Sequence, residues 1–123
     1  MDDTAGIAGF MDGVGRVDAL INSASIFEPD RPETVTPVQL EHTLRVNLVA
    51  PVLLASAMAR RHEDRASGCI INLLDQKLFN LNPDFFSYTL AKQALLGATT
   101  TAAIIKDGHT LTSSRLSSSN GWP

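Results

Sequence analysis

The residues best suited to chemistry in this chain lie close together in its second half. An apolar run ends at Asp75, Tyr88 follows thirteen residues later, and Lys92 comes four residues after Tyr88. Because side chains four apart on a helix project from the same face, Tyr88 and Lys92 are expected to be neighbours. An ammonium group within about 4–6 Å favours a tyrosinate and lowers the pKa of the tyrosine, which helps a phenol exchange a proton near neutral pH. The alternative is that this common spacing only places two polar groups on a solvated helix.

A further polar residue, Asn47, lies inside an apolar segment with helical periodicity. Pro51 follows four residues later, and a proline has no N–H to donate to the carbonyl at position i−4. The backbone carbonyl of Asn47 must therefore bond to another group, such as water. An inward polar side chain and a freed carbonyl coincide at this position, which indicates a functional site. The alternative is a proline kink that only shapes packing.

Two strands are expected to position these residues. The first, Val17–Ile21, is a short apolar run that leads into a loop of small residues. The second, Cys69–Leu74, has no polar alternation except Asn72, which is typical of a parallel strand covered on both faces. Asp75 would then lie at the carboxyl end of a parallel strand, where α/β sheets bind ligands.

Three helices are expected around these strands. Thr4–Val14 is interpreted as the end of a helix that precedes the first strand. The stretch Thr36–Gln39 contains a threonine that can cap, a proline suited to the first helical position and a glutamine that completes a capping box. Apolar spacing extends this second helix to Arg61. A third helix should begin near Pro83 and run to about Ile105.

The order of these elements predicts an α/β fold, an incomplete Rossmann-type layered parallel sheet with flanking helices. Residues 1–105 would form this partial domain, and the Ser-rich residues 106–123 an irregular, disordered tail. Only two strands are predicted, although a buried parallel pair needs neighbours along its edges. The sequence therefore resembles the middle of a larger domain.

Composition excludes several classes of protein. A hydrophobic content of 44% and a charged content of 19% are typical of soluble globular domains. The net charge of −3 disfavours a nucleic-acid partner. The single cysteine, Cys69, fits a reducing compartment, and the acidic stretch Met1–Asp3 is unlike a signal peptide. The longest apolar stretch, Val46–Ala59, is too short to cross a bilayer, and the histidines lack metal-ligand spacing. We expect a cytoplasmic protein with no membrane, metal or nucleic-acid partner.

The joint pattern resembles the short-chain dehydrogenase/reductase family over roughly Val17–Ala103. The family's Asn-Asn-Ala-Gly loop corresponds to Asn22–Ser25, its helix asparagine to Asn47, and its catalytic tyrosine and lysine to Tyr88 and Lys92. The resemblance implies NADPH as cofactor, with Lys92 on the nicotinamide ribose and Asn47 anchoring a water in a proton relay. The cofactor-binding residues that it implies are Asn22, Ala24, Ser25, Tyr88 and Lys92.

One position departs from most members of the family, which carry a serine where this chain has Asp75. An aspartate there, with a serine-ended loop and a nearby aromatic residue, is similar to the pteridine reductase and dihydromonapterin reductase branch. This resemblance implies that Asp75 and Tyr88 deliver a proton to a pterin while NADPH supplies the hydride. Ser25 would contact cofactor and substrate, Phe27 would stack on the pterin ring, and Asp75 would accept hydrogen bonds from the pterin.

The chain also departs from the family at both ends of the resemblance. Family members begin with a strand and a Gly-rich turn that receives the cofactor pyrophosphate. The stretch Gly9–Gly15 matches G-x-x-x-G-x-G, but no strand precedes it and a strand rather than a helix should follow, so we do not expect it to bind a nucleotide. At the other end, Lys106–Leu111 is only faintly similar to a segment near the family's C-terminus.

These departures leave three hypotheses. The leading one is an NADPH-dependent reductase that acts on a small molecule, a pterin or a related carbonyl or imine. The second is a non-catalytic remnant or interaction module that forms a homo-oligomer through its long helices, whose small residues include Ala98–Ala103. The third is a truncated product with no stable fold.

Overall fold

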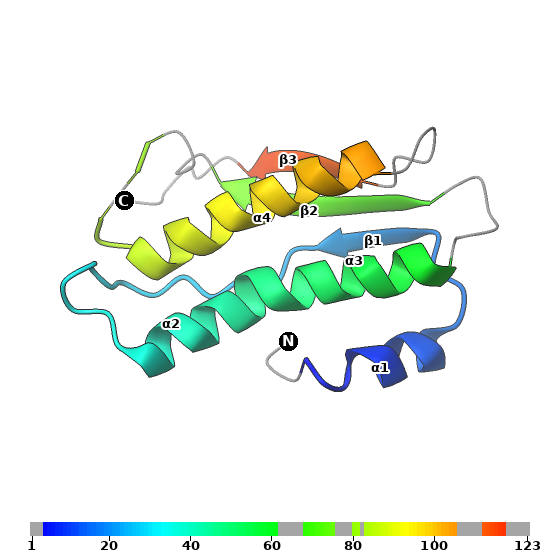
Figure 1. Ribbon diagram of the computed structural model, residues 1–123, viewed down its shortest axis with the longest axis horizontal. Coiled ribbons are helices and arrows are strands. Elements are labelled where there is room, and N and C mark those ends of the chain that lie inside the picture. Colours follow the sequence, from blue (N-terminus) through cyan, green and yellow to red (C-terminus); the bar gives the residue numbers. More distant parts are fainter. Residues whose placement is uncertain (1–3, 62–67, 76–79, 82, 106–111, 118–123) are drawn as a thin grey trace.

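The computed structural model describes residues 4–61, 68–75, 80–81, 83–105 and 112–117. Helical segments and strands alternate along this part of the chain (Figure 1), which confirms the predicted α/β class. In chain order the elements are α1 (Ile7–Val14), β1 (Ala19–Asn22), α2 (Pro37–Leu44), the π-helix η1 (Arg45–Val49), α3 (Ala50–Arg61), β2 (Cys69–Asp75), α4 (Phe86–Ile105) and β3 (Thr112–Ser117).

The described strands form one parallel sheet in the order β1, β2, β3. Strand β1 begins opposite Cys69 and ends with Asn22 opposite Asn72. The predicted strand at Val17–Ile21 is therefore present, shifted toward the loop by about two residues at its start. Because all strands run in the same direction, the carboxyl ends of β1 and β2 meet at one edge of the sheet.

Strand β3 differs from the expectation of an irregular tail over residues 106–123. It pairs with β2 from Thr112 opposite Ile70 to Ser117 opposite Asp75. The expectation is wrong for these six residues, while residues 106–111 and 118–123 lie outside the described part of the chain. A Ser-rich segment shows no apolar alternation, but backbone N–H and C=O groups are enough to extend a ladder along β2.

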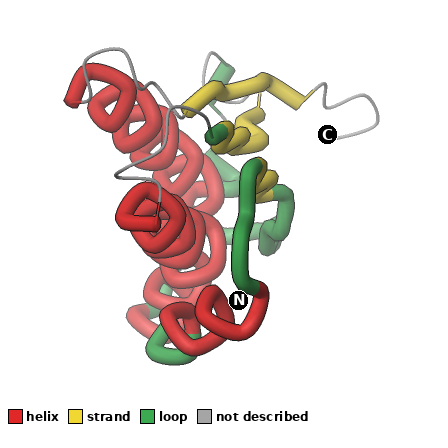
Figure 2. Tube along the Cα trace, turned by 90° about the vertical axis from the view of Figure 1, so that its right-hand side faces the viewer, coloured by secondary structure: helices red, strands yellow, loops and turns green. Residues whose placement is uncertain are grey.

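Helices α3 and α4 lie side by side on the same side of the sheet, as two perpendicular views show (Figures 1 and 2). On β2, Ile70, Asn72 and Leu74 are buried, whereas Ile71 and Leu73 are half-buried. The sequence predicted that both faces of β2 are buried. Within the described residues, only the face that carries Ile70, Asn72 and Leu74 is fully buried.

The long helical segment predicted from Thr36 to Arg61 is present, with a change of winding in its middle. Thr36 Oγ1 accepts a hydrogen bond from the backbone N–H of Gln39 at 3.2 Å, as expected for an N-cap. Between α2 and α3 the chain winds as the π-helix η1, where the N–H of Ala50 donates to the carbonyl of Arg45. Pro51 follows directly, and it has no backbone N–H to donate to a carbonyl. The π-helical turn therefore ends before Pro51.

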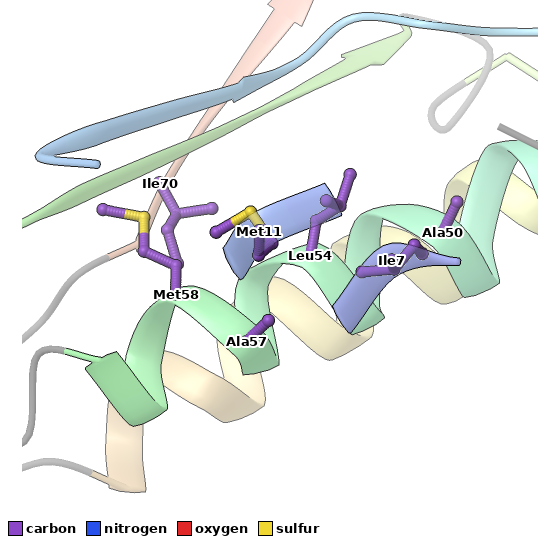
Figure 3. Packing of buried hydrophobic residues seen from close by; sticks show 7 residues of the cluster. All are labelled: Ile7, Met11, Ala50, Leu54, Ala57, Met58 and Ile70. Carbon is purple, nitrogen blue, oxygen red and sulfur yellow. The ribbon is translucent and has the colours of Figure 1, made fainter. Parts of the chain in front are cut away.

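One apolar cluster fills the space between α1, α3 and the beginning of β2 (Figure 3). Met11 and Met58 are 1% and 0% exposed, and the other members lie around them. Val17, Leu20 and Ala55 pack against the cluster from its margin. The buried members of this apolar cluster are Ile7, Met11, Ala50, Leu54, Ala57, Met58 and Ile70.

The helical segment Pro37–Arg60 has the length and hydropathy of a membrane span, by length and composition only. This segment is longer than the apolar stretch noted from the sequence. It also contacts α1, β1 and α4, and 44% of its apolar window is buried within the protein. The core helix of a folded domain has the same properties, so the segment is weak evidence for a membrane.

The glycines that match a nucleotide loop lie elsewhere than the match requires. Gly9 and Gly13 are inside α1, and Gly15 follows its end with a φ of 80°, a conformation that favours glycine. Helix α1 leads into β1, as expected for a helix before the first strand, but it begins at Ile7 and not at Thr4. In the described residues this stretch is a helix terminus and not a strand-to-helix turn.

Candidate active site

The carboxyl end of β2 meets the first turn of α4, and this contact joins Asp75 to Tyr88. Tyr88 Oη donates a hydrogen bond to Asp75 Oδ2 at 2.7 Å. The two residues are 2% and 0% exposed, so the bond is shielded from water. The structure thus brings together the first two residues that the sequence singled out for proton transfer.

Lys92 lies one helical turn beyond Tyr88, as the spacing predicts. Its Nζ donates to the carbonyl of Leu73 at 2.9 Å and lies 5.7 Å from the centre of the Tyr88 ring. Burial lowers the pKa of Lys92 from its usual value, and the negative charge of Asp75 opposes this effect. The ammonium group is therefore held between a strand carbonyl and the phenol ring.

The pKa of Tyr88 moves in the direction opposite to the one expected from Lys92 alone. Burial raises the pKa of Tyr88 well above its usual value, and the hydrogen bond to Asp75 and the charge of Asp75 raise it further. A hydrogen bond with Ser25 acts in the lowering direction. The prediction that Lys92 lowers this pKa is wrong here, because burial and the adjacent carboxylate dominate. The phenol of Tyr88 is consequently held in its protonated form, with its proton directed at Asp75.

Asn47 fixes the loop that connects β1 and α2, residues 23–36, to the π-helix η1. Its Oδ1 accepts from the N–H of Ile26, and its Nδ2 donates to the carbonyl of Ile26, both at 2.7 Å. Asn47 is 1% exposed, which confirms that its side chain points inward. The residues on either side of Ile26 are Ser25 and Phe27, so Asn47 positions both of them.

Phe27 lies against two aromatic rings. Its ring stacks on Phe85 with centroids 4.0 Å apart and meets the Tyr88 ring at 4.7 Å in an edge-on arrangement. Both phenylalanines are half-buried, in contrast to the buried tyrosine. Ser25 and Phe27 thus reach Tyr88 from the β1–α2 loop, while Asp75 reaches it from the sheet.

Asn22 takes part in a buried hydrogen-bond chain that crosses the sheet. Its Nδ2 donates to Asn72 Oδ1 at 2.7 Å, Asn72 Nδ2 donates to Thr99 Oγ1 at 2.8 Å, and Thr99 Oγ1 donates to the carbonyl of Leu95 at 2.7 Å. The chain connects β1, β2 and α4, so each amide is satisfied in the core.

The predicted cofactor residues Asn22 and Ala24 lie in a different environment from Tyr88. Both line a groove of about 250 Å³ between β1, α1 and α3, together with Phe10, Leu20 and Ile21. The structure therefore divides the predicted residues into two groups. Those gathered around the phenol are Ser25, Phe27, Asp75, Tyr88 and Lys92.

Several residues of this site were not predicted from the sequence. Phe85 precedes Tyr88 in the stretch "FFSY", but nothing in the sequence indicated that it stacks on Phe27. Asn72 was noticed as a break in an apolar run and assigned no role. Asp30 lies in a Pro-rich connection without any local signal, yet it bonds to Ser87. In the part of the chain that the structure describes, no three His, Cys, Asp or Glu side chains are grouped so that they could hold a metal ion.

A protein family and several known proteins match most of this chain. The model of the short chain dehydrogenase family matches residues 3–109. Dehydrogenase/reductase SDR family member 4 of Homo sapiens is 33% identical over 92 residues, covering 73% of this chain and 33% of that protein. Pteridine reductase 1 of Leishmania tarentolae is 33% identical over 110 residues, covering 73% of this chain and 38% of that protein.

Solved structures give the same result. FolM alternative dihydrofolate reductase 1 from Brucella canis, complexed with NADP, is 32% identical with a TM-score of 0.77 and covers 94% of this chain and 46% of its own. A metagenomic short-chain oxidoreductase in complex with NADP is 32% identical with a TM-score of 0.84 and covers 95% and 55%. The chain spans about a third of the length of the curated relatives and about half of these solved chains. It belongs to the short-chain dehydrogenase family.

Proposed function

We propose that this chain carries the proton-transfer half of an NADPH-dependent oxidoreductase that reduces a pterin or a related carbonyl or imine. The observation that carries the proposal is the buried hydrogen bond of 2.7 Å between Tyr88 and Asp75, with Lys92 beside the phenol ring. The bond holds the phenol proton of Tyr88 at the carboxyl end of a parallel strand, the place where α/β sheets bind ligands. We also propose a cytoplasmic location, as expected from the composition.

The side chains have donors that suit the cofactor. An ammonium group has three N–H donors, and Lys92 gives one of them to the carbonyl of Leu73. The remaining donors suit ribose hydroxyls, and Ser25, which is exposed, shares a hydrogen bond with the phenol. NADPH, when bound, supplies the hydride, while Tyr88 donates the proton and Asp75 orients the phenol. Asn22 and Ala24 would contact the cofactor from the neighbouring groove, and Asn47 would serve the relay by holding the β1–α2 loop.

A pterin fits the polar and aromatic character of this site. Its ring nitrogen and amino group can donate hydrogen bonds to the carboxylate of Asp75, which a simple ketone cannot do. Phe27 is half-buried and already stacked on Phe85, so a planar substrate would extend this stack. Relatives named pteridine reductase 1 and FolM alternative dihydrofolate reductase 1 support the choice.

The experiment that tests this function is a fluorescence titration of the purified chain with NADPH, followed by oxidation of NADPH in the presence of a dihydropterin. We expect saturable binding, and turnover that needs the dihydropterin. The variant Lys92→Met keeps the length of the side chain and removes its donors. We expect this variant to bind NADPH more weakly than the wild type. A folded chain that binds no NADPH would refute the proposal.

A second candidate function, self-association through the long helices, has its own support. Four apolar side chains on η1, α3 and α4 are more than a third exposed, namely Val49, Val52, Leu53 and Leu90. Helices α3 and α4 lie side by side (Figure 1), so their outer surfaces could pack against a second copy of the chain. Light scattering after size-exclusion chromatography tests this candidate. We expect a dimer that Leu53→Glu converts to a monomer, and a wild-type monomer at high concentration would contradict it.

A further inference from the structure

The carboxylate of Asp30 lies at the start of α4, far from it in sequence. The backbone N–H of Ser87 donates to Asp30 Oδ1 at 3.0 Å and to Oδ2 at 3.2 Å, and the Ser87 hydroxyl also donates to Oδ2. Asp30 is 7% exposed and Ser87 is 1% exposed. The carboxylate of a loop residue is therefore buried against the first turn of a helix 57 residues away.

The backbone of Asp30 strengthens the same junction. Its N–H donates to the carbonyl of Asp84 at 2.9 Å, and its carbonyl accepts from the N–H of Phe86 at 3.3 Å. These two bonds make a short parallel bridge between Asp30 and Phe85. On the solvent side, Arg31 pairs with Asp84. The β1–α2 loop and the beginning of α4 are thus joined by both backbone and side-chain contacts.

This junction satisfies groups that a helix alone leaves without partners. The first four N–H groups of an α-helix have no acceptor within the helix, and a negative charge is favoured there by the helix dipole. Asp30 supplies acceptors to the N–H groups of Phe86 and Ser87, the first two residues of α4. Tyr88 is the third residue, so its backbone position depends on this first turn. The same loop also carries Ser25 and Phe27, which contact the side chain of Tyr88.

We propose that Asp30 is a positioning residue for Tyr88. It acts through Ser87 and the first turn of α4, and it holds that turn at a fixed distance from the loop that carries Ser25 and Phe27. Its importance for proton transfer rests on the proposed function, whereas its ordering of Tyr88 does not. Asp30 itself contacts neither the phenol oxygen nor the carboxylate of Asp75 in any bond described above.

The experiment uses the fact that Tyr88 is the single tyrosine of the chain. Isotopic labelling of tyrosine therefore gives ring signals from this residue alone in NMR spectra. The wild-type protein should show cross-peaks between the Tyr88 and Phe27 rings, whose centroids are 4.7 Å apart. In Asp30→Ala we expect these cross-peaks to weaken, because loss of an N-cap acceptor shifts the equilibrium toward an open first turn by about 2- to 30-fold.

Four further variants separate positioning from general destabilisation. Asp30→Asn keeps one oxygen acceptor and should restore most of the cross-peak intensity. Glu33→Ala removes an exposed carboxylate of the same loop, and Met58→Ala destabilises the distant apolar cluster; both should leave the cross-peaks as in the wild type. Should Asp30→Ala fail to fold, Ser87→Ala decides, since it removes only the hydroxyl and should still weaken the cross-peaks measurably.

Wild-type cross-peaks in a folded Asp30→Ala protein would overturn the proposal, as would an unchanged Ser87→Ala protein if Asp30→Ala does not fold. In the presence of NADPH and a dihydropterin, Asp30→Ala should lower kcat more than it changes KM, and Asp30→Asn should restore most of kcat. The NMR measurement needs no cofactor. A chain that binds no NADPH but loses the cross-peaks on substitution of Asp30 would therefore reject the proposed function and retain this inference.

Discussion

The two ends of strand β2 are stabilised by different interactions. Near its beginning, Ile70 packs into the apolar cluster with Met11 and Met58 (Figure 3). At its end, Asp75 accepts a hydrogen bond from Tyr88. Apolar burial is strong but not directional, whereas hydrogen bonds at a buried site fix the distance and orientation of each partner. The comparison teaches that this small domain separates the part that stabilises it from the part that orients reactive groups.

Both ends depend on the same strand register. Because side chains alternate along a strand, Ile70, Asn72 and Leu74 share one face of β2, and a slip by one residue would turn all of them away from the helices. Such a slip would also move Asp75 away from the phenol of Tyr88. The hydrogen bond between Asn22 and Asn72 lies between the two ends and is compatible with only one register.

The largest expected effect is at the polar end. Tyr88→Phe keeps the ring and removes the phenol oxygen, so we expect the rate of dihydropterin reduction to fall by about 10²- to 10⁴-fold. The initial rate of NADPH oxidation, divided by the folded fraction from near-ultraviolet circular dichroism, measures this loss. Val38→Ala, at a position that is 78% exposed on α2, serves as the control and should keep the wild-type rate. A Tyr88→Phe protein with full activity would remove the catalytic role of this residue.

The next largest effect is expected at the apolar end. Met58 is 0% exposed, so Met58→Ala leaves a cavity and should lower the free energy of unfolding by about 2–5 kcal/mol. Urea denaturation measures this change, and Val38→Ala again provides a substitution that removes methyl groups from an exposed position. The rate per folded molecule should remain that of the wild type. If Met58→Ala instead lowers kcat in the folded protein, the two ends are coupled and the comparison fails.

The smallest effect concerns stability at alkaline pH. The pKa of Tyr88 is raised in the folded state above the value of about 10 for an unfolded tyrosine. Its contribution to stability is therefore complete below pH 10 and is lost as the pH rises toward the folded pKa. Above pH 10 the free energy of unfolding of the wild type should decrease by up to about 1.4 kcal/mol per pH unit relative to Tyr88→Phe.

Lys92 acts in the opposite direction and is common to both proteins. Its pKa is lowered by burial, so its contribution is present above the unfolded value and is lost as the pH falls. The difference between the wild type and Tyr88→Phe therefore isolates the tyrosine. Urea denaturation of both proteins at several pH values above 9 provides the measurement, and parallel curves would show that the phenol is not buried in solution.

Much of the fold followed from local features of the sequence. The N-cap at Thr36, the apolar strand that ends at Asp75 and the helical spacing of Tyr88 and Lys92 each depend on neighbouring residues, and the structure has all three. Strand β3 was not predicted, because its residues lack apolar alternation and only the free edge of β2 makes them a strand. The π-helix η1 was not predicted either, since the sequence around Pro51 indicates only that a normal helical bond is missing.

For the candidate site, the sequence by itself determined which side chains are present and which share a helix face, because the helical period fixes the spacing of Tyr88 and Lys92. The tertiary structure alone decided the partners. It placed Asp75 at 2.7 Å from the phenol, reversed the expected direction of the Tyr88 pKa by burial, and brought Asp30 to Ser87 across 57 residues. Contacts and burial arise only when elements distant in sequence pack together, and therefore no local pattern could specify them.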